Sequence, residues 1–301
     1  AWLLLWGRAA VPAGLPEQVR VLRMEDGFIR SIGLGAELVR PLSWVVDGSG
    51  IYYDATASSD LEDLLATHAF DDALCARAAR LRERIVSSRL TKYNVGGAVW
   101  QRPAHAKRVI LVPGQVESDA SLAYGAPGER SNMGLLRSVR AENADAYVAY
   151  KPHPDVAARL RKEGANEQAA LNWCDEVLGD VSMGDLLPQV DEVHVLTSLS
   201  GFEALLQGKA VTCYGQPFYS GWGLTHDRLP NARRQRKLSL DALVAGALIE
   251  YPLYMSRDGR SLIAPEDALD ILLQWRQSRG VHVRWWQRIV RVFLRLIIGV
   301  R

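Results

Sequence analysis

Between residues 109 and 214 the sequence repeats one arrangement, a short apolar run followed by a polar loop and a helical segment. The apolar runs lie at residues 109–112, 146–150, 192–196 and 210–214. Strands that alternate with helical segments favour a parallel sheet joined by right-handed crossovers. Neither a GxGxxG fingerprint nor a Walker A lysine loop follows any of these runs, which argues against NAD binding and P-loop ATP hydrolysis. The predicted fold class is α/β.

The first part of the chain has a different rhythm. Up to about residue 57, short apolar runs alternate with turns that contain Gly or Pro, and we predict strands at residues 3–5, 19–22, 44–46 and 51–53. Ser59 and Glu62 then have capping-box spacing. They open a helical stretch that runs to about residue 90, with a break near residue 70.

From Leu238 onward the pattern is helical. We therefore predict three parts, which are an N-terminal α/β lobe (1–97), a Rossmann-like lobe (98–237) and a helical C-terminal segment (238–301). In the last segment, residues 282–298 carry arginines at helical spacing on one face and apolar side chains on another. Such a basic amphipathic helix fits an anionic bilayer surface and is too charged to span it. The alternative is a helix packed on a partner module.

Composition narrows the class of partner. The chain has 301 residues, of which 48% are hydrophobic and 23% charged, and its formal net charge is +2. That is typical of a folded globular protein and gives no overall drive toward nucleic acid. Three widely spaced cysteines form neither a disulfide framework nor a zinc pattern, which favours a reducing compartment.

The N-terminal apolar run, residues 2–6, is too short to span a membrane and lacks the basic region of a signal peptide. We expect it to form a buried strand that ends at Gly7. The first residue is not Met, so we expect a fragment or one module of a longer protein.

The loop at residues 150–156 holds a histidine between two prolines, directly after a predicted strand. Each proline fixes φ and lacks an N–H, so the loop is stiff and presents Lys151 and His153 in a defined direction. Strand ends are where open α/β sheets bind ligands. We interpret the loop as an anion site for a nucleotide phosphate. The alternative is a structural turn with a solvated Lys151 and a packed His153.

A second loop, residues 113–121, places Gln115, Glu117 and Asp119 at alternate positions. A carboxylate here could act as a nucleophile, a base or a metal ligand. The alternative is an acidic first turn that favours the helix dipole.

A third loop, residues 197–203, also follows a strand and opens a helix. The hydroxyls of Ser198 and Ser200, together with unbonded N–H groups of the first turn, fit a phosphate. The same residues also spell a helix start with Ser200 as the N-cap and Glu203 at the third helical position.

Two other segments carry side chains of note. Glu25 and Asp26 precede Gly27, which is typical of a turn, but a carboxylate there could serve as general acid or base if the loop faces a cleft. Residues 215–223 are rich in glycine and aromatic residues. They could form the lid or wall of a sugar or base pocket, or an irregular crossover loop anchored by Trp222.

Six strings in order along residues 2–255 carry a family resemblance. They are Trp-Gly-Arg at 6–8, Glu-Asp-Gly-Phe-Ile-Arg-Ser at 25–31, Val-Pro-Gly-Gln-Val-Glu-Ser-Asp at 112–119, Tyr-Lys-Pro-His-Pro-Asp at 150–155, Thr-Ser-Leu-Ser-Gly-Phe-Glu-Ala-Leu at 197–205 and Tyr-Gly-Gln-Pro-Phe-Tyr-Ser-Gly-Trp-Gly at 214–223. Together they resemble the capsule polysaccharide biosynthesis family of KpsC/LipB type, the retaining β-Kdo transferases.

The resemblance implies a GT-B-like enzyme with two Rossmann-type lobes and the donor substrate CMP-Kdo in a central cleft. It implies transfer of β-linked Kdo to a Kdo-primed phosphatidylglycerol-type lipid at the cytoplasmic face of the bacterial inner membrane. The expected partners are CMP-Kdo, the glycolipid acceptor, an anionic membrane surface through residues 282–298 and other capsule assembly proteins, with no nucleic acid. No cofactor and no metal are expected.

The resemblance also implies a donor-binding set on the matching positions. Phosphate or ribose contacts are expected from Lys151, His153, Pro154, Ser198, Ser200 and Glu203. CMP leaves as an anion, so such a site needs cations and N–H donors.

The implied chemistry is double displacement. Asp119 would attack the anomeric carbon to form a covalent Kdo adduct, and Glu25 would deprotonate the acceptor hydroxyl. Further substrate contacts are expected from Gln115, Arg30, Arg130, Tyr219 and Trp222, with the two arginines for the Kdo carboxylate. The alternatives are another CMP-sugar transferase, sialyltransferase-like, and a non-catalytic glycolipid-binding or scaffold module.

Overall fold

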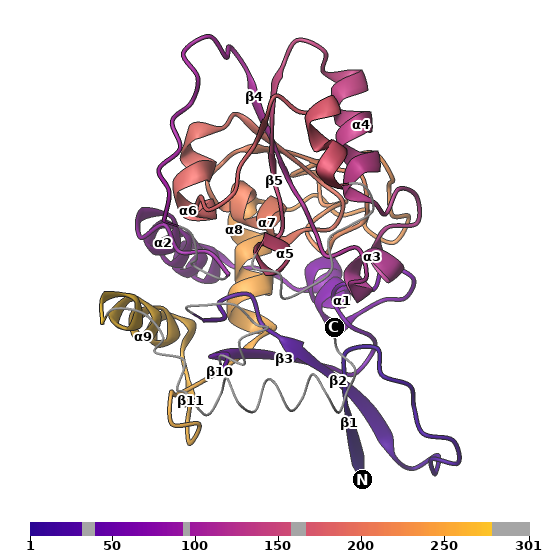
Figure 1. Ribbon diagram of the computed structural model, residues 1–301. Helices are drawn as coiled ribbons and strands as arrows, with labels where there is room; N and C mark the ends of the chain where they lie inside the picture. Colours follow the sequence, from indigo (N-terminus) through magenta and orange to yellow (C-terminus); the bar gives the residue numbers. More distant parts are fainter. Residues whose placement is uncertain (32–39, 93–96, 158–166, 279–301) are drawn as a thin grey trace, which may run out of the picture.

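Six parallel strands form the sheet of the C-terminal lobe in the computed structural model, which describes residues 1–31, 40–92, 97–157 and 167–278 (Figure 1). Their spatial order is β6-β5-β4-β7-β8-β9. The strands are β4 (Val109–Pro113), β5 (Tyr147–Lys151), β6 (Glu176–Val177), β7 (Glu192–Val195), β8 (Ala210–Cys213) and β9 (His226–Asp227). Every residue of β4 is buried, as expected for a central strand covered on both faces. The predicted parallel sheet is confirmed.

The second sheet has five strands in the order β1-β2-β3-β10-β11. The strands are β1 (Trp2–Trp6), β2 (Arg20–Asp26), β3 (Ser43–Asp47), β10 (Leu253–Met255) and β11 (Leu262–Ile263). β1 pairs with β2 in parallel and the other pairs are antiparallel. The N-terminal sheet is therefore completed by strands from the far end of the described chain.

Three local predictions are wrong. The segment after Leu238 is not helical throughout, because β10 and β11 lie within it. Residues 51–53 form a turn rather than a strand. β1 is an edge strand with Trp2 63% exposed, not a buried strand. The predicted boundaries near residues 97 and 237 stay predictions.

Helices fill the space between and around the sheets (Figure 1). In the C-terminal lobe they are α3 (Ala120–Gly125), α4 (Asn132–Glu142), α5 (Pro154–Ala157), α6 (Met183–Leu186) and α7 (Leu199–Leu206), with 3₁₀ turns η2 (Glu167–Asn172) and η3 (Leu187–Gln189). The others are α1 (Asp60–Thr67), α2 (Asp72–Ser87), α8 (Leu240–Val244), the π-helical turn η4 (Ala245–Glu250) and α9 (Pro265–Gln277). As predicted, Ser59 caps α1 by accepting from the Glu62 N–H at 3.1 Å.

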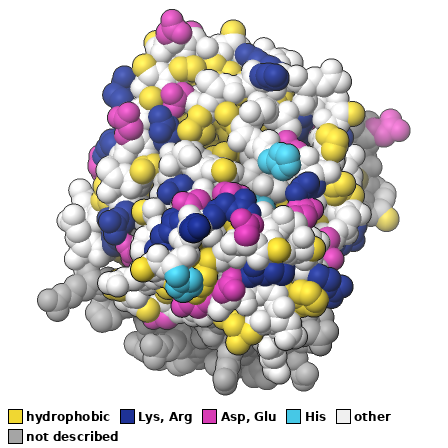
Figure 2. Space-filling view, turned by 90° about the horizontal axis from the view of Figure 1, so that it is seen from above, with side chains coloured by type: hydrophobic (Ala, Val, Ile, Leu, Met, Phe, Trp, Pro, Cys, Tyr) yellow, Lys and Arg dark blue, Asp and Glu magenta, His cyan; other side chains and the backbone are white. Residues whose placement is uncertain are grey.

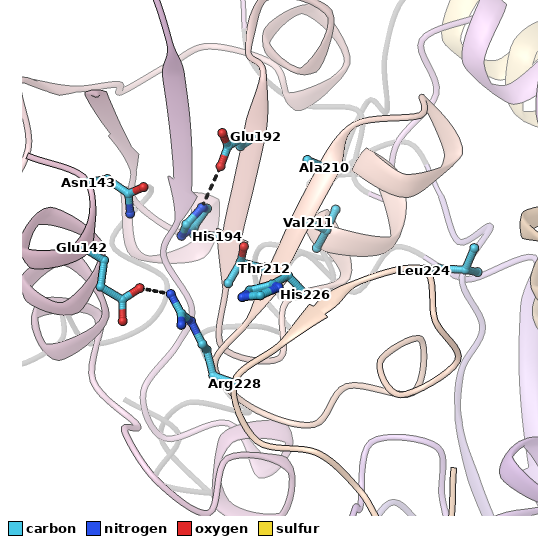
Figure 3. A pocket seen from close by; sticks show the side chains of 10 residues that line it. All are labelled: Glu142, Asn143, Glu192, His194, Ala210, Val211, Thr212, Leu224, His226 and Arg228. Carbon is cyan, nitrogen blue, oxygen red and sulfur yellow. Dashed lines mark hydrogen bonds and ion pairs between the residues drawn. The ribbon is translucent and has the colours of Figure 1, made fainter. Parts of the chain in front are cut away.

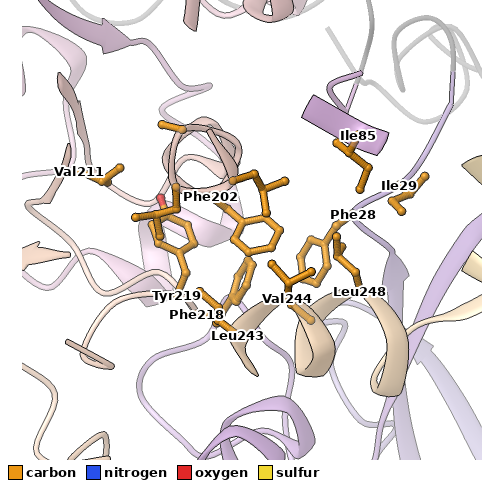
Figure 4. Packing of buried hydrophobic residues seen from close by; sticks show 14 of the residues in the cluster. Phe28, Ile29, Ile85, Phe202, Val211, Phe218, Tyr219, Leu243, Val244 and Leu248 are labelled. Atoms are coloured by element: carbon orange, nitrogen blue, oxygen red, sulfur yellow. The ribbon is translucent and has the colours of Figure 1, made fainter. Parts of the chain in front are cut away.

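An aromatic cluster joins the two lobes (Figure 4). Phe28, which follows β2, stacks on Phe218 of the loop after β8, with ring centroids 4.5 Å apart. Phe202 of α7 lies 5.2 Å from Phe218. The loop at residues 215–223 is therefore a part of the core that spans the lobes. The alternative of a crossover loop anchored by Trp222 describes its packing, and a role as the lid or wall of a pocket stays a prediction.

A buried ion-pair network reinforces the same contact. Glu62 of α1 accepts from Arg234 Nε at 2.8 Å, and both side chains are buried. The Arg234 guanidinium also donates to the carbonyls of Pro217 and Ser220. One arginine thus holds the aromatic loop against the N-terminal lobe.

The surface at the side away from the carboxyl ends of the parallel strands carries both positive and negative side chains. Figure 2 shows Lys and Arg side chains interspersed with Asp and Glu on the face seen from above. No helix in the described ranges is both long and apolar enough to cross a membrane. The predicted amphipathic helix at 282–298 lies outside the described residues.

Candidate active site

The loops after β4, β5 and β7 meet at the carboxyl end of the parallel sheet. Gly114 donates its N–H to the Lys151 carbonyl at 2.8 Å, which joins the first two loops. Gln115 joins the first and third, because its Nε2 donates to Thr197 Oγ1 at 3.0 Å and its Oε1 accepts from the Thr197 N–H at 2.9 Å. The structure therefore brings the three predicted loops together. Gln115, predicted to contact substrate, is a buried clamp between two of them.

Asp119 lies where the first loop enters α3. It caps that helix and accepts from the Ser121 N–H at 3.5 Å, so the capping alternative describes its local structure. The side chain is nonetheless exposed, and a carboxylate has lone pairs beyond the one that a cap uses. Glu117 is differently placed, since its Oε1 accepts from the Asn132 N–H at 2.8 Å. Asp119 is thus the carboxylate of this loop that lies at the surface of the site.

The second loop fixes a histidine and buries a lysine. His153 Nδ1 accepts from the Asp155 N–H at 3.1 Å, so a neutral imidazole carries its proton on Nε2, where it can donate to an anion. Pro154 is the first residue of α5. Lys151 is buried, its Nζ donates to the Gly179 carbonyl at 3.3 Å, and burial lowers the pKa of its ammonium group.

The third loop starts α7, with the N-cap two residues earlier than predicted. Ser198, not Ser200, is the N-cap, and its Oγ accepts from the Ser200 N–H at 3.2 Å. The Ser198 carbonyl also accepts from the Tyr219 hydroxyl. Tyr219 and Trp222 are completely buried and support the loop from within, and the substrate contacts predicted at these two positions stay predictions.

Glu203, one turn further along α7, contacts the backbone of Lys92. Its Oε1 accepts from the Lys92 N–H at 2.7 Å. Burial raises the pKa of Glu203 to about 7, an effect that Lys92 opposes. Glu203 therefore holds the Lys92 backbone in place, and its predicted ribose contact stays a prediction.

Glu25, at the end of β2, brings the N-terminal lobe to this edge. The pKa of its carboxyl group is raised to about 7, chiefly by burial, with smaller contributions in the same direction from the charges of Asp26 and Asp119 and opposing ones from the Asp26 N–H and Lys92. Glu25 therefore lies within electrostatic reach of Asp119 across the two lobes. A carboxyl group with a pKa near neutral is suited to general acid–base chemistry.

The two arginines predicted to bind a sugar carboxylate both interact with other groups of the protein. Arg30 is buried and forms an ion pair with Asp26, and its Nη1 donates to Ser31 Oγ at 2.8 Å. Arg130 is exposed and donates to the Ala126 carbonyl at 2.7 Å. Lys92, close to Glu25 and to Glu203, is a cation of this site that sequence reasoning missed.

Tyr53 was also missed. Burial raises the pKa of its phenol, and the charges of Glu25 and Asp119 add to the effect, so the hydroxyl stays protonated. The sequence predicts a strand at residues 51–53, which are all apolar or aromatic. The signal that could have indicated a site residue is the hydroxyl group of Tyr53, which ends this run directly before Asp54.

A separate pocket opens at the other end of the parallel strands (Figure 3). Its volume is about 430 Å³. Among its lining residues, His194 Nε2 lies 3.2 Å from Glu192 Oε2, and burial lowers the pKa of His194. Arg228 forms an ion pair with Glu142 at the rim. None of the residues predicted for the site lines this pocket.

Within the described ranges, no three His, Cys, Asp or Glu side chains lie close enough to hold a metal ion, and catalysis without metal stays a prediction.

Comparison with known sequences decides the family. Residues 7–256 match the family described as capsule polysaccharide biosynthesis protein. The chain belongs to this family. The resemblance drawn from six short strings is thereby confirmed.

Individual relatives agree with that assignment. The chain is 45% identical over 289 residues to the capsule polysaccharide modification protein LipA of Neisseria meningitidis serogroup B, which covers 94% of this chain and 41% of LipA. It is 46% identical over 259 residues to the lipopolysaccharide-processing protein LpsZ of Rhizobium meliloti, which covers 83% of this chain and 59% of LpsZ. The chain thus spans about half the length of these curated relatives.

Two solved structures resemble the fold. The β-Kdo 2,7 transferase of Thermosulfurimonas dismutans KpsC is 45% identical, with a TM-score of 0.78 over 91% of this chain and 85% of that one. The β-Kdo 2,4 transferase of the same KpsC is 32% identical, with a TM-score of 0.80 over 90% and 86%. The predicted α/β, GT-B-like architecture is confirmed, and these matches support the prediction of a glycosyltransferase.

Proposed function

We propose that this chain is a retaining β-Kdo transferase module of capsular polysaccharide synthesis that uses CMP-Kdo as donor. The observation that carries the proposal is the approach of Glu25 from one lobe to Asp119 of the other, beside the loops that hold His153 and the start of α7. The two solved relatives, both titled β-Kdo transferases, support the choice of sugar.

The donor half of the reaction uses the strand-end loops. His153 Nε2, Ser200 and the N–H groups at the start of α7 bind the CMP phosphate, while Glu203 accepts from ribose hydroxyls. CMP departs as an anion, so donors at this position lower the barrier without a proton acid. Asp119 attacks the anomeric carbon as the bond to the phosphate oxygen breaks, and the electron pair leaves with CMP.

The acceptor half uses Glu25. The acceptor hydroxyl gives its proton to the Glu25 carboxylate, and its oxygen attacks the same carbon. The ester bond to Asp119 then breaks, and its electron pair returns to the Asp119 carboxylate. Two inversions give overall retention, as in glycosidases that use a paired carboxylate.

The acceptor is a Kdo-primed phosphatidylglycerol-type lipid at the cytoplasmic face of the inner membrane. Residues 282–298, outside the described part of the chain, supply the contact with anionic lipid through their arginines. Other capsule assembly proteins bind nearby. No cofactor is needed beyond the donor substrate.

Intact mass spectrometry after incubation with CMP-Kdo tests the proposal. We expect a mass increase of one Kdo residue on the wild-type chain and none on Asp119→Asn. Turnover of CMP-N-acetylneuraminate in place of CMP-Kdo would instead favour the sialyltransferase-like alternative. Release of no CMP from either donor, with lipid acceptor present, would favour a glycolipid-binding scaffold.

A further inference from the structure

Gly7, directly after β1, is closely flanked by two polar side chains. Its φ of +50° lies in the left-handed region, which glycine adopts most easily. A Cβ at this position would lie 2.7 Å from Tyr53 Oη and 3.2 Å from Glu25 Oε2. Both oxygens therefore pack against Gly7, which has no room for a side chain, and this shared neighbour brings them close to each other.

The two oxygens have complementary chemistry at neutral pH. The Tyr53 phenol stays protonated, because burial and the charges of Glu25 and Asp119 raise its pKa. The Glu25 carboxyl, with a pKa of about 7, is ionised in a substantial share of molecules. A hydroxyl group bound between them accepts a hydrogen bond from Tyr53 and donates one to Glu25.

The surrounding contacts fix the position of Gly7 beside these two oxygens. The Gly7 N–H donates to the Met24 carbonyl at 2.8 Å, and Arg23 donates to the Gly7 carbonyl at 2.7 Å. These contacts hold Gly7 against the strand that carries Glu25.

The loop that carries Tyr53 is in turn fixed to α3. The Ala55 N–H donates to the Tyr124 carbonyl at 3.2 Å, and Arg8 pairs with Asp54 at 3.1 Å while its guanidinium lies over the Tyr124 ring. Since α3 begins at the Asp119 cap, Tyr53 is held in a constant relation to Asp119.

We propose that Tyr53 and Glu25, which are brought together beside Gly7, form the niche for the acceptor hydroxyl, with Tyr53 donating to the hydroxyl oxygen while Glu25 takes its proton. The inference rests on the proposed transfer reaction and specifies its second half. The acceptor O–H bond breaks toward Glu25 Oε2, and the oxygen bonds to the anomeric carbon. The carbon–oxygen bond to Asp119 breaks with its electron pair returning to Asp119.

Separate measurement of the two half-reactions tests the niche. Without acceptor, the yield and rate of the covalent Kdo adduct report the first half. We expect Tyr53→Phe and Gly7→Ala to form adduct within about two-fold of wild type, since neither position contacts the donor in this proposal. With a soluble Kdo-primed acceptor, transfer by each variant should fall about 10- to 100-fold, as for the loss of one hydrogen bond to a reacting group.

The matched control is Tyr147→Phe. Tyr147 is also a hydroxyl paired with a carboxyl group, since it donates to Glu176 at 2.8 Å, but it lies on β5 away from Glu25. This variant should match wild type in both half-reactions. Thermal unfolding of all variants identifies any loss of folded protein, and Tyr53→Phe keeps the test valid if Gly7→Ala does not fold.

The outcomes separate the niche from the function on which it rests. Transfer by Tyr53→Phe at the wild-type rate overturns the niche while the function stands, and so does an equal loss of both half-reactions. Wild-type protein that neither forms adduct nor transfers Kdo overturns the proposed function and the niche with it.

Discussion

The two lobes place their functional groups in different ways. In the C-terminal lobe, Asp119, His153 and Ser198 are each oriented by a backbone N–H two residues further along the chain. In the N-terminal lobe, the pKa of Glu25 is governed first by burial and then by charges on other segments, among them Asp119 of the opposite lobe. The orientation of the groups in the proposed phosphate-binding half is thus a property of local backbone geometry. The proposed base depends on how the lobes pack.

The contact between the lobes is consequently part of the site. Phe28 follows β2, the strand that carries Glu25, and stacks on Phe218, and Glu62 holds Arg234 in the same region. These are buried aromatic and ionic contacts, which favour one fixed arrangement over a freely hinged one. The predictions below ask whether the two modes of placement can be disturbed separately.

The largest effect is expected from Asp119→Asn. Loss of a nucleophile lowers transfer by roughly 10⁴-fold or more. Asn caps helices about as well as Asp, so the free energy of unfolding should change by less than about 0.5 kcal/mol. Initial rates with CMP-Kdo measure the loss of transfer, and urea unfolding curves measure the change in the free energy of unfolding. A large loss of stability would show that the cap, and not the chemistry, is what this position supplies.

Glu62→Ala should have the largest effect on stability. It leaves the Arg234 guanidinium buried without its carboxylate, which costs about 3–5 kcal/mol. Asp270→Ala is the control, because its pair with Arg84 is exposed and contributes about 0–1 kcal/mol. Equal urea midpoints for the two variants would contradict a fixed contact between the lobes.

Glu25→Gln and Glu203→Gln should stabilise the protein in a pH-dependent way. Both carboxyl groups have a folded-state pKa of about 7 against a usual 4.5, so the folded state binds more protons between these values and stability falls as pH rises through that window. At pH 8 each variant should be more stable than wild type by roughly 1–2 kcal/mol, and near pH 4 the gain should vanish. Thermal unfolding across pH measures this, with the exposed Glu17→Gln as control. A gain that did not depend on pH would refute the raised pKa values.

The smallest effect separates the two serines of α7. Ser198→Ala removes the N-cap and should cost about 1 kcal/mol, whereas Ser200→Ala should cost less than about 0.5 kcal/mol. In the proposed donor site, both variants bind CMP more weakly. Chemical denaturation combined with calorimetric titration of CMP distinguishes the roles. A reversed order of stability would restore Ser200 as the cap.

The sequence predicted the parallel sheet and its strand-end loops well, because β4, β5, β7 and β8 are short, buried apolar runs flanked by clear loops. It failed for β10 and β11, since strands of three and two residues carry too little pattern. The run at 51–53 has strand-forming residues but is held as a turn by its packing.

The side chains of the candidate site also differ in whether their positions could be predicted from the sequence. Asp119, His153 and Ser198 could be placed from sequence because they sit at fixed offsets from strand ends. Tyr219 and Trp222 could not, because an aromatic residue serves a pocket wall or a core equally well and only packing decides. The position of Tyr53 in the site depends on the packing of the loop after β3 on α3.

The sheet of the N-terminal lobe has one further consequence, for the order of folding. β3 ends at Asp47, yet its partner β10 begins at Leu253, so the edge of β3 stays open while almost the whole C-terminal lobe is being synthesised. Closing so long a loop carries an entropic cost that grows with the logarithm of its length, and pairings of this kind form slowly. The C-terminal lobe, built from neighbouring βα units, can fold as soon as it leaves the ribosome. We expect it to serve as the platform on which β3 and β10 finally pair.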